Sequence, residues 1–129
     1  MKKLSLLICL FISFNLSAQN SKKDKLIGKW KLYQEIEDGE DTSSECSRKT
    51  TIEFFNNGTY SITEYVEESE IDDTCYGEMR KNNWKNIGDS KYIFRGKKTT
   101  NIYFEKDMYY FIYTGVDYTI KYVYRRVND

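Results

Sequence analysis

The chain has 129 residues, balances 20 basic against 20 acidic side chains, and contains no histidine and no proline. Without an overall basic character, non-specific nucleic-acid binding is not expected. The absence of histidine removes the Ser-His-Asp triad and the commonest general base, and three cysteines are too few for a typical zinc site. Carboxylate pairs remain, but they gather in loops, so we expect no enzyme, no cofactor and no bound metal.

Residues 1–19 have the features of an export signal. Lys2 and Lys3 precede an apolar run, Leu4–Phe14, that is too short to cross a bilayer as a helix. Small residues end this segment, so cleavage is expected after residue 18 or 19. Residues 20–129 then form one domain without a membrane span, and the protein is expected in the periplasm or outside the cell.

Two cysteines, Cys46 and Cys75, remain in the exported part. An even number of cysteines in an exported protein indicates a disulfide, and free thiols or a metal pair are the alternatives. A bridge that closes a loop of this length stabilises a fold by about 3–4 kcal/mol in the chain-entropy model.

The first expected strand is Lys29–Glu37, where residues alternate between two faces. Trp30, Leu32 and Ile36 share one face, which we expect to be the inner one. Gln34 is the polar exception on that face.

The next two strands, Thr51–Phe55 and Thr59–Val66, flank an Asn-Asn-Gly turn. A two-residue turn would mix apolar and polar residues on each face. A three-residue loop with Gly58 in the left-handed conformation instead aligns the apolar residues, namely Phe54 with Tyr60 and Ile52 with Ile62. The pattern therefore predicts a bulged hairpin in which Ser61 and Thr63 point outward.

Five further strands are expected, which brings the number to eight in an antiparallel meander. Their ranges are Met79–Ile87, Lys91–Arg95, Thr99–Glu105, Met108–Thr114 and Tyr118–Val127. Tyrosines occupy both faces of the last two strands, so the pattern does not decide which of their residues point inward.

The connections 38–48 and 67–78 are long, whereas most of the others are tight turns. In an up-and-down barrel both long loops lie at one end, so Cys46 and Cys75 can meet there and Trp30 lies at the other end, near Arg125 or Arg126. Ten acidic residues would ring the loop end: Glu37, Asp38, Glu40, Asp41, Glu45, Glu67, Glu68, Glu70, Asp72 and Asp73. Such a ring would attract cationic ligands or partners, hold calcium weakly, or simply be solvated.

Gly28-Lys29-Trp30 at the start of the domain, with a terminal arginine (Arg125 or Arg126) to pack on the tryptophan, resembles the lipocalin (calycin) superfamily. The small lipocalin-like domains of exported Bacteroidetes proteins are the most similar. Lys106-Asp107-Met108-Tyr109 loosely echoes the second motif of the superfamily. The resemblance implies an all-β, eight-stranded, antiparallel up-and-down barrel. It does not choose a function, because such proteins bind small apolar molecules, bind proteins, or occasionally catalyse reactions.

Two functions are therefore expected as alternatives for a monomer. The first is a carrier of a small apolar or amphipathic molecule, with a cavity lined by Phe54, Ile62, Trp84, Phe94, Ile102 and Phe104. The second is an interaction module, in which a filled barrel displays the acidic loops 38–48 and 67–78 to a protein partner.

Overall fold

The structure is a computed structural model that describes residues 23–68 and 74–128, so the expected export signal lies outside the described residues. It is an all-β protein with one antiparallel sheet. The only helix in the described residues is a single 3₁₀ turn, η1 (Ser47–Lys49). The strands are β1 (Gly28–Glu37), β2 (Glu40–Asp41), β3 (Thr51–Phe54), β4 (Thr59–Glu67), β5 (Cys75–Gly88), β6 (Lys91–Phe94), β7 (Thr99–Asn101), β8 (Tyr103–Glu105), β9 (Met108–Thr114) and β10 (Thr119–Arg126).

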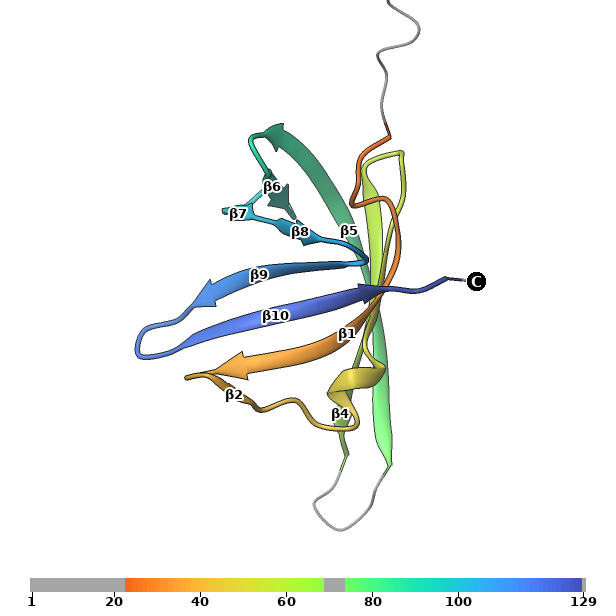
Figure 1. The fold of residues 1–129 in the computed structure, drawn as a ribbon. Helices are drawn as coiled ribbons and strands as arrows, with labels where there is room; N and C mark the ends of the chain where they lie inside the picture. The colour runs from red at the N-terminus through yellow and green to blue at the C-terminus, as the bar shows by residue number, and fades with distance from the viewer. Residues whose placement is uncertain (1–22, 69–73, 129) are drawn as a thin grey trace, which may run out of the picture.

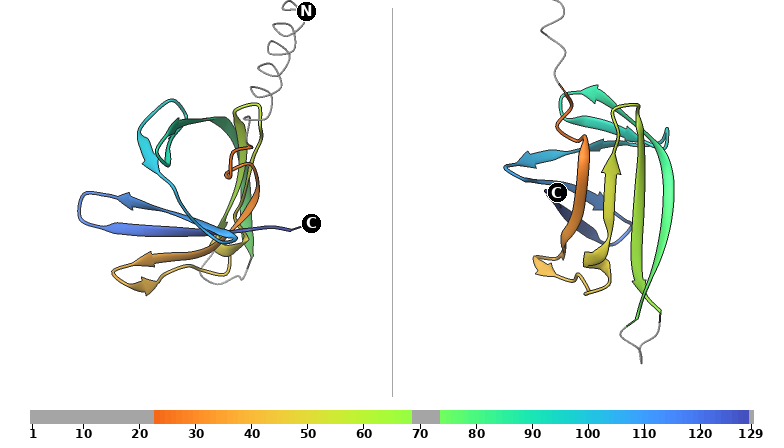
Figure 2. Two further views of the ribbon diagram at one scale, coloured as in Figure 1. Left: turned by 45° about the horizontal axis from the view of Figure 1, so that its top comes forward. Right: turned by 90° about the vertical axis from the view of Figure 1, so that its right-hand side faces the viewer.

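The sheet curls strongly but its path does not close (Figure 1, Figure 2). Its order is β7-β6-β5-β4-β3-β1-β10-β9-β8, with β2 beside β1. The expected single strand Thr99–Glu105 is divided at Ile102, whose N–H donates to the carbonyl oxygen of Ser90 at 2.8 Å. The segment before Ile102 pairs with β6 and the segment after it pairs with β9. The eight-stranded closed barrel is therefore not confirmed.

The strand β5 is longer than expected. It begins at Cys75 instead of Met79, because β4 pairs with it continuously from Thr59 to Glu67. Part of the connection 67–78 is consequently strand and not loop. The remaining predicted strands agree with the structure to within a residue or two at each end.

The predicted bulged hairpin is confirmed. Ile52 lies opposite Ile62 and Phe54 opposite Tyr60. Gly58 has a φ of +83°, which is the left-handed conformation that this loop requires. Ser61 and Thr63 lie on the outer face, since they alternate with the two buried or half-buried apolar positions.

A β-bulge in β1 reverses the expected alternation. The register with β10 shifts between Leu32 and Gln34, so that Leu32 lies opposite Tyr124 but Glu35 lies opposite Tyr122. Tyr122 and Tyr124 share one face, and Glu35 therefore lies on the inner face with Leu32. The expectation that Gln34 and Ile36 point inward is wrong, because the extra residue moves both to the outer face.

The register of the last hairpin decides the inward residues that the sequence left open. Tyr109 lies opposite Tyr124 and Phe111 opposite Tyr122, and both pairs belong to the inner face. Tyr110 and Val123 form the neighbouring pair on the outer face. The inner side of β9 and β10 is thus almost entirely aromatic.

Buried aromatic side chains fill one end of the curled sheet, which we call the packed end. Its members include Trp30, Phe54, Trp84, Tyr92, Ile102, Tyr109 and Tyr124. The Trp30 ring meets Tyr109 edge-on at 4.7 Å between centroids, and Tyr109 stacks on Tyr124 at 5.0 Å. Both indole N–H groups are satisfied: that of Trp30 donates to the carbonyl of Leu26 at 2.9 Å, and that of Trp84 to the carbonyl of Thr59 at 3.0 Å.

The predicted disulfide between Cys46 and Cys75 is confirmed. It joins the segment just before η1 to the first residue of β5, and the Cys46 side is buried. The two long connections of the chain are thereby held together at the end opposite the packed end.

Candidate functional site

Most of the expected cavity-lining residues lie in the packed end. Phe54, Trp84 and Ile102 are buried, and Phe94 and Phe104 are half-buried against them. The Phe54 ring alone has the rings of Tyr60, Trp84 and Phe94 within 6 Å of its centroid. Together these side chains fill the interior of the packed end. Ile62 is the only residue of the expected set that lies towards the opposite half of the inner face.

The arginine and tryptophan of the expected barrel-end motif meet at the packed end. The Arg126 guanidinium lies 4.2 Å from the Trp30 ring centroid and donates to the carbonyls of Lys25 and Ile27. Gly28 has a φ of +131°, and a Cβ there would stand 2.5 Å from the Arg126 side chain. The sequence left Arg125 and Arg126 as alternatives, and the structure assigns this position to Arg126.

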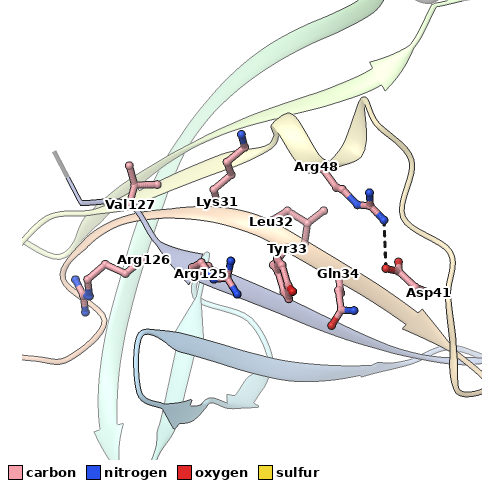
Figure 3. A pocket seen from close by; sticks show the side chains of 9 residues that line it. All are labelled: Lys31, Leu32, Tyr33, Gln34, Asp41, Arg48, Arg125, Arg126 and Val127. Carbon is pink, nitrogen blue, oxygen red and sulfur yellow. Dashed lines mark hydrogen bonds and ion pairs between the residues drawn. The ribbon is translucent and has the colours of Figure 1, made fainter.

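Arg125 lies on the outer face, where it borders a hollow of about 460 Å³ (Figure 3). Its guanidinium stacks 4.0 Å from the Tyr33 ring centroid, and Arg48 pairs with Asp41 at 3.2 Å across the same hollow. Hydrogen bonds from Ser43, together with Arg48, lower the pKa of Asp41. Arg48 and Asp41 of this hollow are thus already paired with each other, and Arg125 is stacked on Tyr33. A second hollow on the outer face of β4 and β5 is lined mainly by polar residues.

The expected acidic ring is only partly described. Glu70, Asp72 and Asp73 lie outside the described residues. Of the others, Glu37 is half-buried, while the rest are exposed: Asp38, Glu40, Asp41, Glu45, Glu67 and Glu68. Within residues 23–68 and 74–128, no group of acidic and cysteine side chains has the arrangement of a metal site.

The other half of the inner face carries half-buried side chains, and we call it the open inner face. Its half-buried members include Glu35, Glu37, Ile62, Glu64, Phe111, Ile120 and Tyr122, and the exposed Arg80 lies on the same face opposite Ile62. Phe111 and Tyr122 stack at 5.2 Å between centroids. The strand register places Glu35 directly opposite Tyr122. Burial raises the pKa of Tyr122, and the negative charges of Glu35 and Glu64 raise it further.

The two carboxylates differ in their partners. Glu64 pairs with Arg80 at 2.5 Å. Glu35 forms no ion pair with any of the described residues. Burial raises the pKa of the Glu35 carboxyl above its ordinary 4.5, and the charges of Asp41 and Glu64 raise it further.

A carboxylate beside aromatic faces suits an organic cation. The carboxylate supplies the opposite charge, and the electron-rich ring faces attract the cation and cover its apolar part. Sequence reasoning missed Glu35, because without the bulge it falls on the outer face. The one signal in the sequence was Gln34, the residue that interrupts the apolar alternation at the place where the bulge occurs.

No helix in the described part of the chain combines the length and apolarity that a membrane crossing needs. In comparisons with known proteins, no family model, no curated protein and no solved structure matches this chain.

Proposed function

We propose that this chain is a binding protein that takes a small amphipathic cation on the open inner face. The observation that carries the proposal is the Glu35 carboxylate, which lies half-buried beside Tyr122 with a raised pKa and no cationic partner among the described residues. Keeping a charge in such a place costs free energy, and a ligand cation would offset that cost. Proteins often place a half-buried carboxylate without a cationic partner where a bound ligand supplies the opposite charge.

The apolar part of the ligand would lie against the aromatic side of the same face. Phe111 and Tyr122 offer a stacked pair, and Ile62 offers an aliphatic surface on the same inner face. These side chains are half-buried, so a ligand can still remove apolar area from water there. The packed end has little such area left, because its members already bury one another.

The proposal includes a lipocalin-like barrel that is exported. Its support is the meander order of the strands, the Arg126 guanidinium over Trp30 at the packed end, and the curl of the sheet around an aromatic interior. The disulfide is compatible with an oxidising compartment such as the periplasm or the cell exterior.

One observation favours the second candidate function, a module that presents its acidic loops to a protein partner. The packed end is filled, and the disulfide fixes the connections 38–48 and 67–78 to each other. A partner recognised in this way would be basic, and its binding would weaken steeply with salt. Neutralising Glu40, Glu45 and Glu68 together should abolish its capture, and unchanged capture would reject this function.

Calorimetric titration with octyltrimethylammonium, below its micelle concentration, tests the proposed function. We expect saturable binding, much weaker binding of octyl sulfate, and a loss of about tenfold or more in Glu35→Gln, since a charge-assisted contact contributes about 1.5–3 kcal/mol. Glu53→Gln is the matched control, because Glu53 lies on the outer face opposite Lys29. Equal binding of both detergents, or full affinity in Glu35→Gln, would reject the proposal.

A further inference from the structure

The first half of β5 is a free edge of the sheet. Residues 75–83 pair with β4 on one side, whereas β6 pairs only with the later part, Trp84–Gly88. No described strand pairs with the other side of residues 75–83. In the right-hand view of Figure 2, this part of β5 forms the border of the sheet.

The backbone groups that face this free edge can be assigned from their neighbours. The carbonyl oxygen of Asn83 accepts from the N–H of Arg95 on the β6 side, and the N–H of Trp84 donates to Gly58 on the opposite side. Backbone direction alternates along a strand, so the odd-numbered residues point to the free edge. Gly77, Met79 and Lys81 therefore present unpaired N–H and C=O groups there.

The edge has few of the features that usually prevent strand addition. Its pairing with β4 runs without a bulge, and the chain has no proline. Side chains 76–81 are all exposed, including Met79 at 62% and Tyr76 at 55%. Three charged residues are present, namely Glu78, Arg80 and Lys81, and the two that flank Met79 have opposite signs.

We propose that this edge pairs antiparallel with the same edge of a second copy of the chain, about a two-fold axis at Met79. In that register Met79 lies opposite the partner's Met79, and Glu78 lies opposite the partner's Arg80. Gly77, Met79 and Lys81 of each copy then donate and accept backbone hydrogen bonds across the axis. The two sheets become one continuous sheet, and the proposal departs from the monomer expected from the sequence.

Charge complementarity selects both the occupant and the register. An axis at position 78 places Glu78 opposite the partner's Glu78. An axis at position 80 places Arg80 opposite the partner's Arg80. Like charges directly opposite each other destabilise a strand pair, so only the Met79 register joins opposite charges across the axis. In one copy Arg80 already pairs with Glu64, and in the dimer it lies between Glu64 and the partner's Glu78.

Sedimentation over a range of concentrations, with the disulfide intact, tests this proposal. We expect the wild-type chain to be a reversible dimer and Glu78→Arg to raise its dissociation constant at least tenfold, because arginine at 78 faces the partner's Arg80. The monomer should tolerate this change, since position 78 lies opposite Glu64 in its own chain. Lys85→Glu, in the part of β5 that pairs with β6, is the control that should leave dimerisation unchanged.

A charge swap between two variants separates pairing at this edge from general effects of charge. Arg80→Glu alone should also lose the dimer, whereas an equimolar mixture of Glu78→Arg and Arg80→Glu should form a heterodimer. Failure of the mixture to associate would overturn the proposal. A wild-type chain that stays monomeric at millimolar concentration, or a Glu78→Arg chain that dimerises as well as wild type, would overturn it too.

Discussion

The packed end and the open inner face belong to the same strands but use their aromatic residues differently. Trp30 and Glu35 are five residues apart on β1, yet Trp30 is 1% exposed among other rings whereas Glu35 stands half-exposed at the edge of a single aromatic pair. Packing at one end supplies the apolar burial that holds the sheet together. The other half therefore remains free to carry unpaired charge and unburied ring surface.

Strand lengths explain why the two halves differ. The strands β6, β7 and β8 have 4, 3 and 3 residues, and they accompany only the parts of β5 and β9 that lie at the packed end. Among the described strands, the remaining parts of β5 and β9 have a neighbour on one side only. The open inner face and the free edge of β5 are two consequences of these short strands.

The largest difference between the two halves should appear in stability. Trp84→Ala removes a buried ring and the two hydrogen bonds that its N–H donates, so we expect it to lower the free energy of unfolding by about 3–5 kcal/mol. Phe111→Ala, on the open inner face, should cost about half as much or less. Urea denaturation of both variants measures the two losses in the free energy of unfolding. Equal losses would contradict the contrast between the two halves.

Removal of the disulfide should have the next-largest effect on stability. Replacing Cys46 and Cys75 together by serine should lower the free energy of unfolding by about 2–4 kcal/mol. Amide hydrogen exchange should show faster exchange near the start of β5 than at Trp30, since the bridge holds the loop end and not the packed end. Uniformly faster exchange across both halves would contradict this placement.

The two arginines at the end of β10 allow a direct comparison, because they are neighbours in the chain but lie on opposite faces of the sheet. Arg126→Ala loses the contact with the Trp30 ring and two hydrogen bonds to backbone carbonyls, which should cost about 2 kcal/mol. Arg125→Ala loses an exposed stack on Tyr33, which should cost less than about 1 kcal/mol. Thermal denaturation ranks the two, and the reverse order would contradict the assignment of Arg126 to the Trp30 contact.

Sequence patterns predicted most of the packed end and little of the open inner face. The hairpin at Gly58 follows from turn chemistry, and the arginine over Trp30 was expected from the barrel arrangement and the resemblance. At the opposite end, the disulfide follows from the number of cysteines and their places in the two long connections. The division of a strand at Ile102 depends instead on which neighbours reach it across the sheet.

The bulge in β1 shows why the site was harder to predict than the fold. One extra residue near Tyr33 exchanges the faces of Gln34 and Glu35, and a period-of-two pattern has no means of placing such an insertion. Phe111 and Tyr122 were also undetermined, because tyrosines alternate with other apolar residues on both faces of the last hairpin.

The smallest expected effect is a pH dependence that belongs to Glu35. Its pKa is higher in the folded chain than in the unfolded one, so folding favours the protonated form. This contribution is present below pH 4.5 and is lost as the pH rises through the folded pKa. Because the group is partly exposed, we expect less than about 1 kcal/mol. The difference between wild type and Glu35→Gln in urea midpoints from pH 4 to 7 measures it, and a gain in wild-type stability relative to Glu35→Gln as the pH rises would contradict it.

The contrast between the two halves is tested most directly by a titration of the labelled protein with octyltrimethylammonium, followed residue by residue in NMR spectra. We expect saturable shifts centred on Glu35, Phe111 and Tyr122, with the Trp30 and Trp84 indole signals nearly unmoved. Shifts centred on the two indoles would place the ligand in the packed end and contradict the account of two halves. A complete absence of saturable shifts would reject the open inner face as a ligand site.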